Sequence, residues 1–356
     1  MKFDFDDILL TPEIISKINS RKEINPYDIN GMLPIFTAPM DTVVDMSNCS
    51  TFFKNKIYSI LPRCQLNFIL QGWNVWCAYG LEEFKEKFLD KYYFSPHPDD
   101  DDFKPETQYV LIDVANGHMA GLFEMAKLAK EKYGDLLVLM VGNVANPQTY
   151  KKYCEIGVDY VRCGIGGGQA CLTSVQTGVG YPMASLINEC YKIKVDGGFK
   201  TKIVADGGFK KFSDINKALA LGSDYVMLGS MLNKCLESSA TTLQNMFPSQ
   251  NDNPVNFTEC FDVSISELLI KRGLLFKQYR GMSTKEVQKD WGKSKIKTAE
   301  GISKYNKVEY TLKGFTENLE DYLRSAMSYT GSLNLLEFKG TEFELISSAS
   351  FKRFEK

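Results

Sequence analysis

The chain has 356 residues, of which 44% are hydrophobic and 24% charged, the composition of an ordinary globular protein. Its formal net charge is −2 and its pI is about 5.9. With no basic excess and no helix of clustered lysines and arginines, neither a nucleic-acid partner nor a membrane surface is expected.

The N-terminal residues, the cysteines and the histidines exclude further classes of protein. Residues 1–7 are acidic and lack an apolar stretch, and the longest apolar run, residues 136–141, is too short to cross a bilayer. We therefore expect a cytoplasmic protein whose nine cysteines are free thiols, none of them in a Cys-x-x-Cys zinc pair. With only His97 and His118 available, a Ser-His-Asp hydrolase is a poor match.

Short apolar runs that end in Gly, Asp or Asn recur along the chain. They are near-continuous rather than alternating, which is typical of strands buried on both faces of a parallel sheet. Eight such runs predict strands at residues 34–38, 57–61, 75–78, 109–113, 137–141, 160–163, 202–205 and 225–228.

Amphipathic segments separate most of these runs and predict helices at residues 121–133, 147–156, 182–193 and 214–221. Eight-fold alternation predicts an α/β fold, a (β/α)8 TIM barrel that forms a single domain over residues 1–356. A doubly wound open sheet is the alternative. Residues 95–102 are expected to form a surface loop, and residues 250–301 an insertion after the eighth strand that contains a mobile flap at residues 283–299.

The active site of such a barrel is built just beyond the C-terminal ends of its strands. The sixth strand leads into residues 164–173, where four glycines among residues 164–168 allow close approach of a ligand, although a flexible turn is the alternative. Cys171 follows these glycines and is a candidate thiolate nucleophile, the alternative being an inert buried thiol.

The seventh and eighth strands end in Asp206-Gly207-Gly208 and Gly229-Ser230. Barrels commonly bind a phosphate there through backbone N–H groups, and Asp206 could then hold ribose hydroxyls. A second Asp-Gly-Gly-Phe-Lys at residues 196–200 follows a helix-like segment and is interpreted as a connecting loop.

Together these residues resemble the IMP dehydrogenase/GMP reductase family, from Phe3 to about Gly331. The blocks that carry the resemblance are residues 3–10, 38–43, 113–117, 142–144, 164–173, 206–208, 226–230, 279–282 and 299–301. The resemblance implies a purine-nucleotide oxidoreductase in which the loop cysteine bonds to purine C2. It also implies a homotetramer.

The resemblance leaves two branches of the family as candidates for the activity of this protein. The reductase converts GMP to IMP and ammonia with NADPH, whereas the dehydrogenase oxidises IMP to XMP with NAD. Residues 177–182 resemble the reductase, no regulatory domain interrupts the barrel, and residues 283–299 lack the dehydrogenase's Arg-Tyr pair. Residues 280–282 look more like the dehydrogenase. We favour the reductase, with IMP dehydrogenase as the alternative.

By resemblance, Cys171 is the nucleophile, Thr173 and Glu300 form a proton relay, and Asp113 lies near the nicotinamide and the reacting centre. The implied substrate contacts are Asp206, Gly207, Gly208, Gly229, Ser230, Tyr279, Gly281, Met282 and Gln169. The implied cofactor contacts are Asp113, Asn116, Gly164, Gly166 and Ala78. Carbonyls of Gly164, Gly166 and Cys171 are candidate ligands of a monovalent cation such as K⁺.

Two positions depart from the family pattern. Gln169 stands where the family usually has a serine that contacts phosphate, and Arg63 stands where the reductases usually have a lysine. These departures leave room for a deoxy or modified guanine nucleotide as the substrate. There are two further alternatives: a non-catalytic nucleotide-binding protein, and an unrelated barrel enzyme such as an aldolase. An aldolase would need a lysine at the end of a strand to form a Schiff base with its substrate.

Overall fold

The computed structural model describes residues 2–63, 75–91, 106–245, 257–259, 266–282, 284–290, 300–347, 350 and 352. The loop predicted at residues 95–102 lies outside these ranges. Among the helices described, none combines the length and the apolar character needed to cross a membrane.

Eight parallel strands form one sheet in the order β2-β9-β8-β7-β6-β5-β4-β3. The strands are β2 Ile35–Thr37, β3 Ile60–Leu61, β4 Trp76–Tyr79, β5 Gln108–Asp113, β6 Leu137–Val144, β7 Tyr160–Cys163, β8 Lys202–Asp206 and β9 Tyr225–Leu228. Each overlaps one of the predicted apolar runs. Just before β3, the backbone N–H of Tyr58 donates to Ile35 of β2 at 3.0 Å, so the two ends of the sheet meet. The predicted (β/α)8 barrel is confirmed.

Aromatic side chains fill the barrel toward the end opposite the predicted site. Trp76, Tyr160 and Tyr225 are the first residues of their strands, and Phe36 of β2 reaches the same layer. Ring centroids lie 5.5 Å apart for Phe36 and Trp76, 5.0 Å for Trp76 and Tyr160, and 5.8 Å for Tyr160 and Tyr225. Because these rings occupy the interior near the N-terminal ends of the strands, a ligand can enter only from the C-terminal ends.

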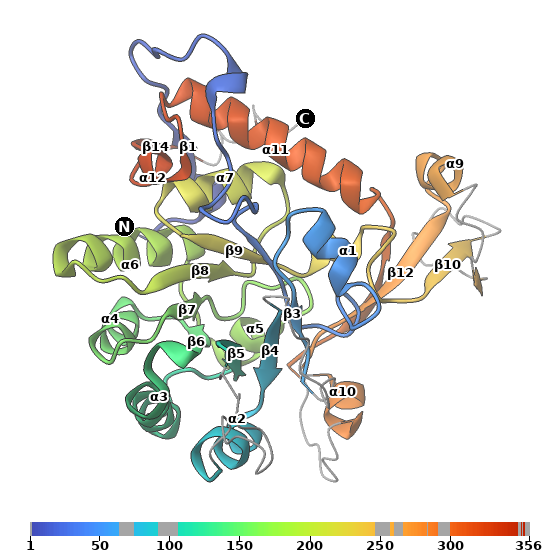
Figure 1. Cartoon of the computed structure of the whole chain (residues 1–356). Coiled ribbons are helices and arrows are strands. Elements are labelled where there is room, and N and C mark those ends of the chain that lie inside the picture. The colour runs from blue at the N-terminus through green and yellow to red at the C-terminus, as the bar shows by residue number, and fades with distance from the viewer. Residues whose placement is uncertain are drawn as a thin grey trace.

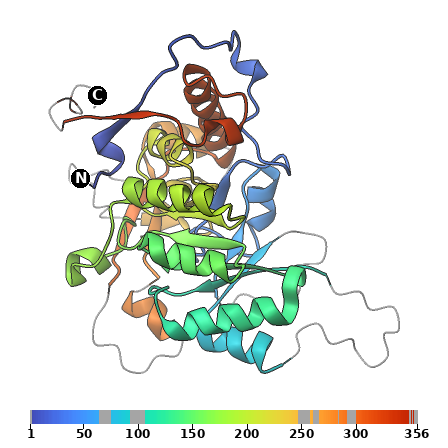
Figure 2. The ribbon, with the colours of Figure 1, turned by 90° about the vertical axis from the view of Figure 1, so that its left-hand side faces the viewer.

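Helices surround the barrel, and α6, α4 and α3 lie side by side along its outside (Figures 1 and 2). The longer helices are α3 Ala120–Tyr133, α4 Pro147–Glu155, α6 Met183–Gly197, α7 Phe212–Ala220 and α11 Leu312–Tyr329. The shorter ones are α1 Cys49–Lys54, α2 Leu81–Phe84, α5 Thr173–Thr177, α8 Ser230–Asn233 and α12 Leu335–Phe338, with single turns η1 Phe5–Asp7, η2 Arg21–Glu23, η3 Lys85–Leu89 and η4 Gly134–Leu136. A two-stranded antiparallel pair, β1 Ile8–Leu10 and β14 Phe343–Leu345, joins the two termini.

The helix boundaries follow local signals that the sequence carries. At the start of α4, the side chain of Asn146 accepts the N–H of Gln148 at 2.8 Å, and Pro147 occupies the first helical position. The prediction of a connecting loop at residues 196–200 is wrong for its first two residues. Asp196 and Gly197 end α6, because the left-handed conformation that stops the helix is adopted by the second glycine, Gly198.

The insertion after β9 contains a four-stranded antiparallel sheet in the order β11-β10-β12-β13. Its strands are β10 Thr242–Asn245, β11 Phe257–Glu259, β12 Leu275–Arg280 and β13 Ser303–Lys307, with α9 Ser266–Lys271 and α10 Lys285–Asp290. In Figure 1, β10, β12 and α9 extend to one side of the barrel. Of the predicted flap, residues 284–290 are described and include α10, while Ser283 and residues 291–299 lie outside the described ranges.

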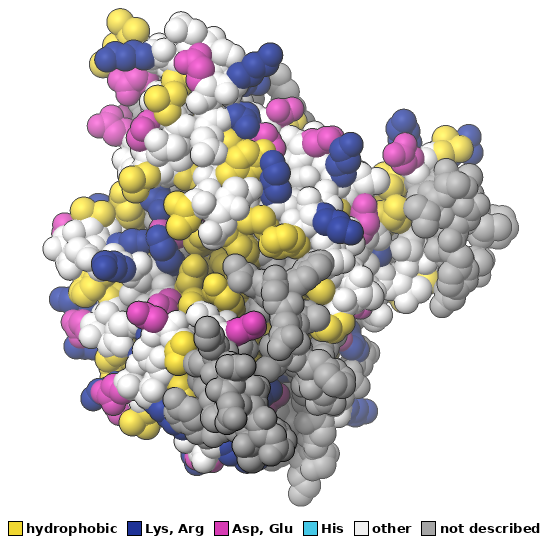
Figure 3. Space-filling model, viewed as in Figure 1, with side chains coloured by type: hydrophobic (Ala, Val, Ile, Leu, Met, Phe, Trp, Pro, Cys, Tyr) yellow, Lys and Arg dark blue, Asp and Glu magenta, His cyan; other side chains and the backbone are white. Residues whose placement is uncertain are grey.

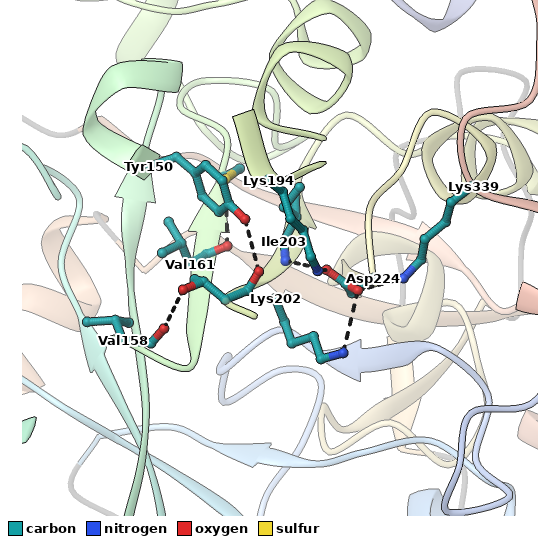
Figure 4. Close-up of polar contacts among 10 residues, drawn as sticks. Tyr150, Val158, Val161, Lys194, Lys202, Ile203, Asp224 and Lys339 are labelled. Carbon is teal, nitrogen blue, oxygen red and sulfur yellow. Dashed lines mark hydrogen bonds and ion pairs between the residues drawn. The ribbon is translucent and has the colours of Figure 1, made fainter. Parts of the chain in front are cut away.

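A buried carboxylate ties the C-terminal segment to the barrel (Figure 4). Asp224, just before β9, lies 2.6 Å from Lys194 of α6 and 2.6 Å from Lys339, which follows α12. It also accepts the backbone N–H of Ile203 at 2.8 Å. On the molecular surface, positive and negative side chains are interspersed over the face in Figure 3.

Candidate active site

Loops from the C-terminal ends of the barrel strands surround a cavity of about 530 Å³. This volume is within the usual range of small-molecule sites. The predicted site residues that line it are Cys171, Thr173, Glu300, Asp113, Asp206, Gly207, Gly208, Gly229, Ser230, Tyr279, Gly281, Met282, Gln169, Gly164 and Gly166. Tyr279, Gly281, Met282 and Glu300 come from the insertion, so β12 and the segment before β13 complete the wall.

Two predicted cofactor contacts do not line the cavity. Ala78 is buried within β4, where its backbone pairs with Leu111 of β5. Asn116 is exposed, and its side-chain oxygen accepts the backbone N–H of His118 at 3.1 Å. The structure therefore places both residues outside the group that the other predicted site residues form.

A chain of hydrogen bonds links the thiol of Cys171 to a carboxylate. The thiol lies 3.3 Å from the hydroxyl of Thr173, which in turn donates to the carboxylate of Glu300 at 2.6 Å. Backbone pairing holds the two segments together, because Leu172 N–H donates to the carbonyl of Glu300 and Ile302 N–H donates to that of Ala170. A thiol, a hydroxyl and a carboxylate in hydrogen-bond contact form a path along which a proton can move.

Glycines allow the loops after β7 and β8 to pack closely. Gly166 has φ +81°, and a Cβ built there would lie 1.6 Å from the hydroxyl oxygen of Ser174. Gly207 has φ +94°, and its Cβ would lie 3.0 Å from the backbone nitrogen of Gly168. Any side chain at either position would displace the neighbouring loop, which is why the sequence has glycine there.

A buried arginine holds the two carboxylates of the site, those of Asp113 and Asp206, in fixed orientations. Arg162 of β7 donates to Asp113 at 2.6 Å and to Asp206 at 2.8 Å. Burial opposes its charge, but the attraction of Asp206 and Asp113 outweighs that effect and raises the pKa of Arg162. Asn143 donates to Asp206 at 2.7 Å, and Arg63 lies 3.3 Å from the other oxygen of Asp113. Both acidic side chains therefore have set orientations before any ligand binds.

Sequence reasoning did not assign Arg162 or Asn143 to the site. A signal for Arg162 was present, because an arginine in an otherwise apolar buried strand needs a carboxylate partner nearby. Asn143 belongs to residues 142–144, one of the blocks that carry the family resemblance, but the resemblance gave it no role. Its side chain binds Asp206 and also the carbonyl of Gly164, both at 2.7 Å.

Tyr279 of β12 closes the end of the cavity formed by β9. Its hydroxyl lies 3.6 Å from the sulfur of Met40. A Cβ added to Gly229 would come within 2.7 Å of the same hydroxyl. Burial, together with the nearby Asp206 and Cys171, raises the pKa of Tyr279, so the phenol stays neutral. Gly229, Ser230 and the Gly207-Gly208 turn line the cavity beside this neutral hydroxyl, where no acidic side chain of their own would oppose an anion.

The predicted cation site stays a prediction. In the part of the chain that the structure describes, no cluster of three or more His, Cys, Asp and Glu side chains could hold a metal. Of the three predicted carbonyl ligands, that of Gly164 already accepts a hydrogen bond from Asn143.

Comparison with known proteins connects this geometry to a family. The family model described as "IMP dehydrogenase / GMP reductase domain" matches residues 103–247 and 258–355. A GMP reductase from Lactobacillus delbrueckii subsp. bulgaricus is 28% identical over 361 residues, covering 97% of this chain and 95% of that protein. GMP reductase 2 from Bos taurus is 28% identical over 93% of this chain and 90% of its own, and GMP reductase 2 from Homo sapiens is 28% identical over 95% and 92%. The chain belongs to the IMP dehydrogenase/GMP reductase family.

Proposed function

We propose that this protein is an NADPH-dependent GMP reductase, which converts GMP to IMP and ammonia. The observation that carries the proposal is the hydrogen-bonded series Cys171, Thr173 and Glu300, set in a cavity between an anion-binding end and Asp113. The names of the similar proteins support the reductase branch.

The nucleotide would bind with its phosphate at the end of the cavity that Gly208, Gly229 and Ser230 form. Asp206 would accept hydrogen bonds from the ribose hydroxyls, in the orientation that Arg162 and Asn143 impose. The purine would then extend toward Cys171, with Gly281 and Met282 against the base. Binding at the phosphate end thus determines which purine carbon meets the sulfur.

The first chemical step forms a bond between the sulfur of Cys171 and purine C2 and breaks the bond from C2 to the exocyclic nitrogen. The proton that the thiol loses passes through Thr173 and Glu300 to that nitrogen, so the amine leaves as ammonia. An amine bound to a purine is a poor leaving group, and a positioned proton donor is needed for its departure. Atoms and charge balance, leaving a neutral thioether.

The second step replaces the carbon–sulfur bond with a carbon–hydrogen bond and releases the thiolate, which takes up one proton from solvent to regenerate the thiol. NADPH, when bound, supplies the hydride for this reduction. Asp113 and Arg63 line the cavity away from Gly229, and these residues would hold the nicotinamide end. The carboxylate can accept hydrogen bonds from an amide N–H, and the guanidinium can donate them to an amide oxygen. These two residues therefore fit the nicotinamide of NADPH.

The test is to mix the purified protein with GMP and NADPH and to follow the absorbance of NADPH together with ammonia release. We expect one ammonia for each NADPH oxidised. Parallel reactions with dGMP, and with IMP and NAD, distinguish the alternatives. NAD reduction with IMP and no NADPH oxidation with GMP would instead establish the dehydrogenase.

A further inference from the structure

A lysine of β13 contacts two residues that line the cavity. Lys304 of β13 lies opposite Tyr279 of β12 in the antiparallel pair. Its ammonium donates to the side-chain oxygen of Gln169 at 2.8 Å and lies 5.9 Å from the centroid of the Tyr279 ring. Gln169 and Tyr279 both line the cavity, and Lys304 lies directly behind Gln169 without lining the cavity itself.

The charge of Lys304 has no anionic partner in the described parts of the chain. The neighbouring cations are paired: Arg162 with Asp113 and Asp206, and Arg280 with Asp41. Lys304 is partly buried, yet no described carboxylate lies within ion-pair distance, and the amide oxygen of Gln169 is neutral. Burial, and then the charge of Lys234, lower the pKa of Lys304. A partly desolvated ammonium without a counterion is unfavourable unless a ligand supplies the anion.

The position of Lys304 indicates which part of a nucleotide it would meet. Gly168, adjacent to Gln169, packs against Gly207, and the hydroxyl of Tyr279 packs against Gly229. Through Gln169 and Tyr279, Lys304 is therefore connected to the part of the cavity that Gly207 and Gly229 line. We propose that Lys304 binds the phosphate of the nucleotide and that Gln169 positions its ammonium for this contact. The inference rests on the proposed function only in requiring a purine nucleoside monophosphate as ligand.

The experiment compares GMP with guanosine, since the two differ only in the phosphate. Dissociation constants measured by calorimetry on the full-length protein should show that Lys304→Met weakens GMP binding about tenfold, as expected for loss of a charge-assisted hydrogen bond. Guanosine binding should not change. The matched control is Lys307→Met, an exposed lysine on the same strand, which should affect neither ligand. Equal GMP-to-guanosine affinity ratios in wild-type protein and Lys304→Met would overturn the proposal.

Variants at Gln169 test its positioning role. Gln169→Glu would give Lys304 a permanent carboxylate partner and place a negative charge near the phosphate, so it should weaken GMP binding more than Gln169→Leu does. If Gln169 only fills space, Gln169→Leu will weaken GMP binding by the same factor in wild-type protein and in Lys304→Met, whereas a positioning role predicts a loss only when Lys304 is present. In turnover, Lys304→Met should raise KM for GMP and leave kcat unchanged, because the phosphate contact is the same before and during the reaction.

Failure of the proposed reaction is distinguishable from failure of this inference. A protein that oxidises no NADPH with GMP but binds IMP refutes the reductase reaction. The phosphate comparison is then made with IMP and inosine. A preserved difference between these two ligands in Lys304→Met would overturn the role of Lys304, whereas its loss would support that role.

Discussion

The hydroxyl of Thr173 donates a 2.6 Å hydrogen bond to the carboxylate of Glu300, which lies 127 residues further along the chain. One residue follows the cysteine loop of the barrel, and the other precedes the last strand of the insertion. The contact connects the insertion to the cysteine loop, because without it the thiol of Cys171 has no described hydrogen-bonded path to a carboxylate.

Replacing Cys171, the proposed nucleophile, separates the chemical step from the binding of the nucleotide. We expect Cys171→Ala to abolish NADPH oxidation with GMP while leaving the dissociation constant of GMP within about twofold, because the sulfur makes its bond only during reaction. Steady-state rates and calorimetric titration on the same preparation provide the measurement. A variant that retains normal turnover would refute the covalent mechanism.

The proton relay predicts a selective loss at Glu300. Glu300→Gln keeps the shape of the side chain but cannot transfer a proton, so deamination should slow by about 10² or more while GMP binding changes little. Single-turnover ammonia release measures the step directly. Thr173→Ser, which keeps the hydroxyl, should retain more activity than Thr173→Val. Equal losses of rate and affinity in Glu300→Gln would contradict the relay.

Arg162 is predicted to be important for stability as well as for binding. Its removal in Arg162→Met leaves Asp113 and Asp206 without their shared counterion in a largely buried setting. Breaking a buried pair in this way typically costs about 3–5 kcal/mol. Urea unfolding should detect the loss, and Arg162→Lys should recover part of it. A change below about 1 kcal/mol would show that solvent screens these carboxylates.

The Asp224 cluster predicts a dependence of stability on pH. Burial alone would raise the pKa of Asp224, but Lys339 and Lys194 outweigh it and lower the pKa. Because the folded-state pKa is below the unfolded value of about 4, the contribution is complete above that value and is lost as the pH falls through the folded pKa. The free energy of unfolding of wild-type protein should exceed that of Asp224→Asn at pH 7, and the difference should shrink below about pH 4.

The exposed Asp135 provides the control for this measurement, since Asp135→Asn should leave the pH profile unchanged. If the difference between wild-type protein and Asp224→Asn stays constant from pH 7 to about pH 3, the carboxylate does not act through its charge.

The apolar runs of the sequence were sufficient to predict the barrel, whereas the roles assigned to Cys171 and the residues around it stay predictions. Strands buried on both faces must be apolar along their whole length, so runs such as residues 225–228 are recognisable without any partner in view. The glycine turn before Cys171 is also recognisable locally, because a run of glycines permits positive φ, although the loop that packs against it is visible only in the structure. The helix predicted at residues 182–193 was placed correctly, but α6 continues to Gly197 because Gly198 is the residue that stops it.

Only the tertiary structure showed how distant side chains come together at the candidate site. The resemblance paired Thr173 with Glu300, and the structure brings them into contact, but nothing in the sequence indicated that Lys304 contacts Gln169 or that Arg162 lies between Asp113 and Asp206. The sequence predicted an insertion at residues 250–301 with a flap at 283–299, yet β12 and β13 form a sheet that extends to Lys307, brings Tyr279 to the cavity and places Lys304 beside Gln169. Such contacts depend on strand register and loop closure across more than a hundred residues, and a local pattern of residue types carries no information about either.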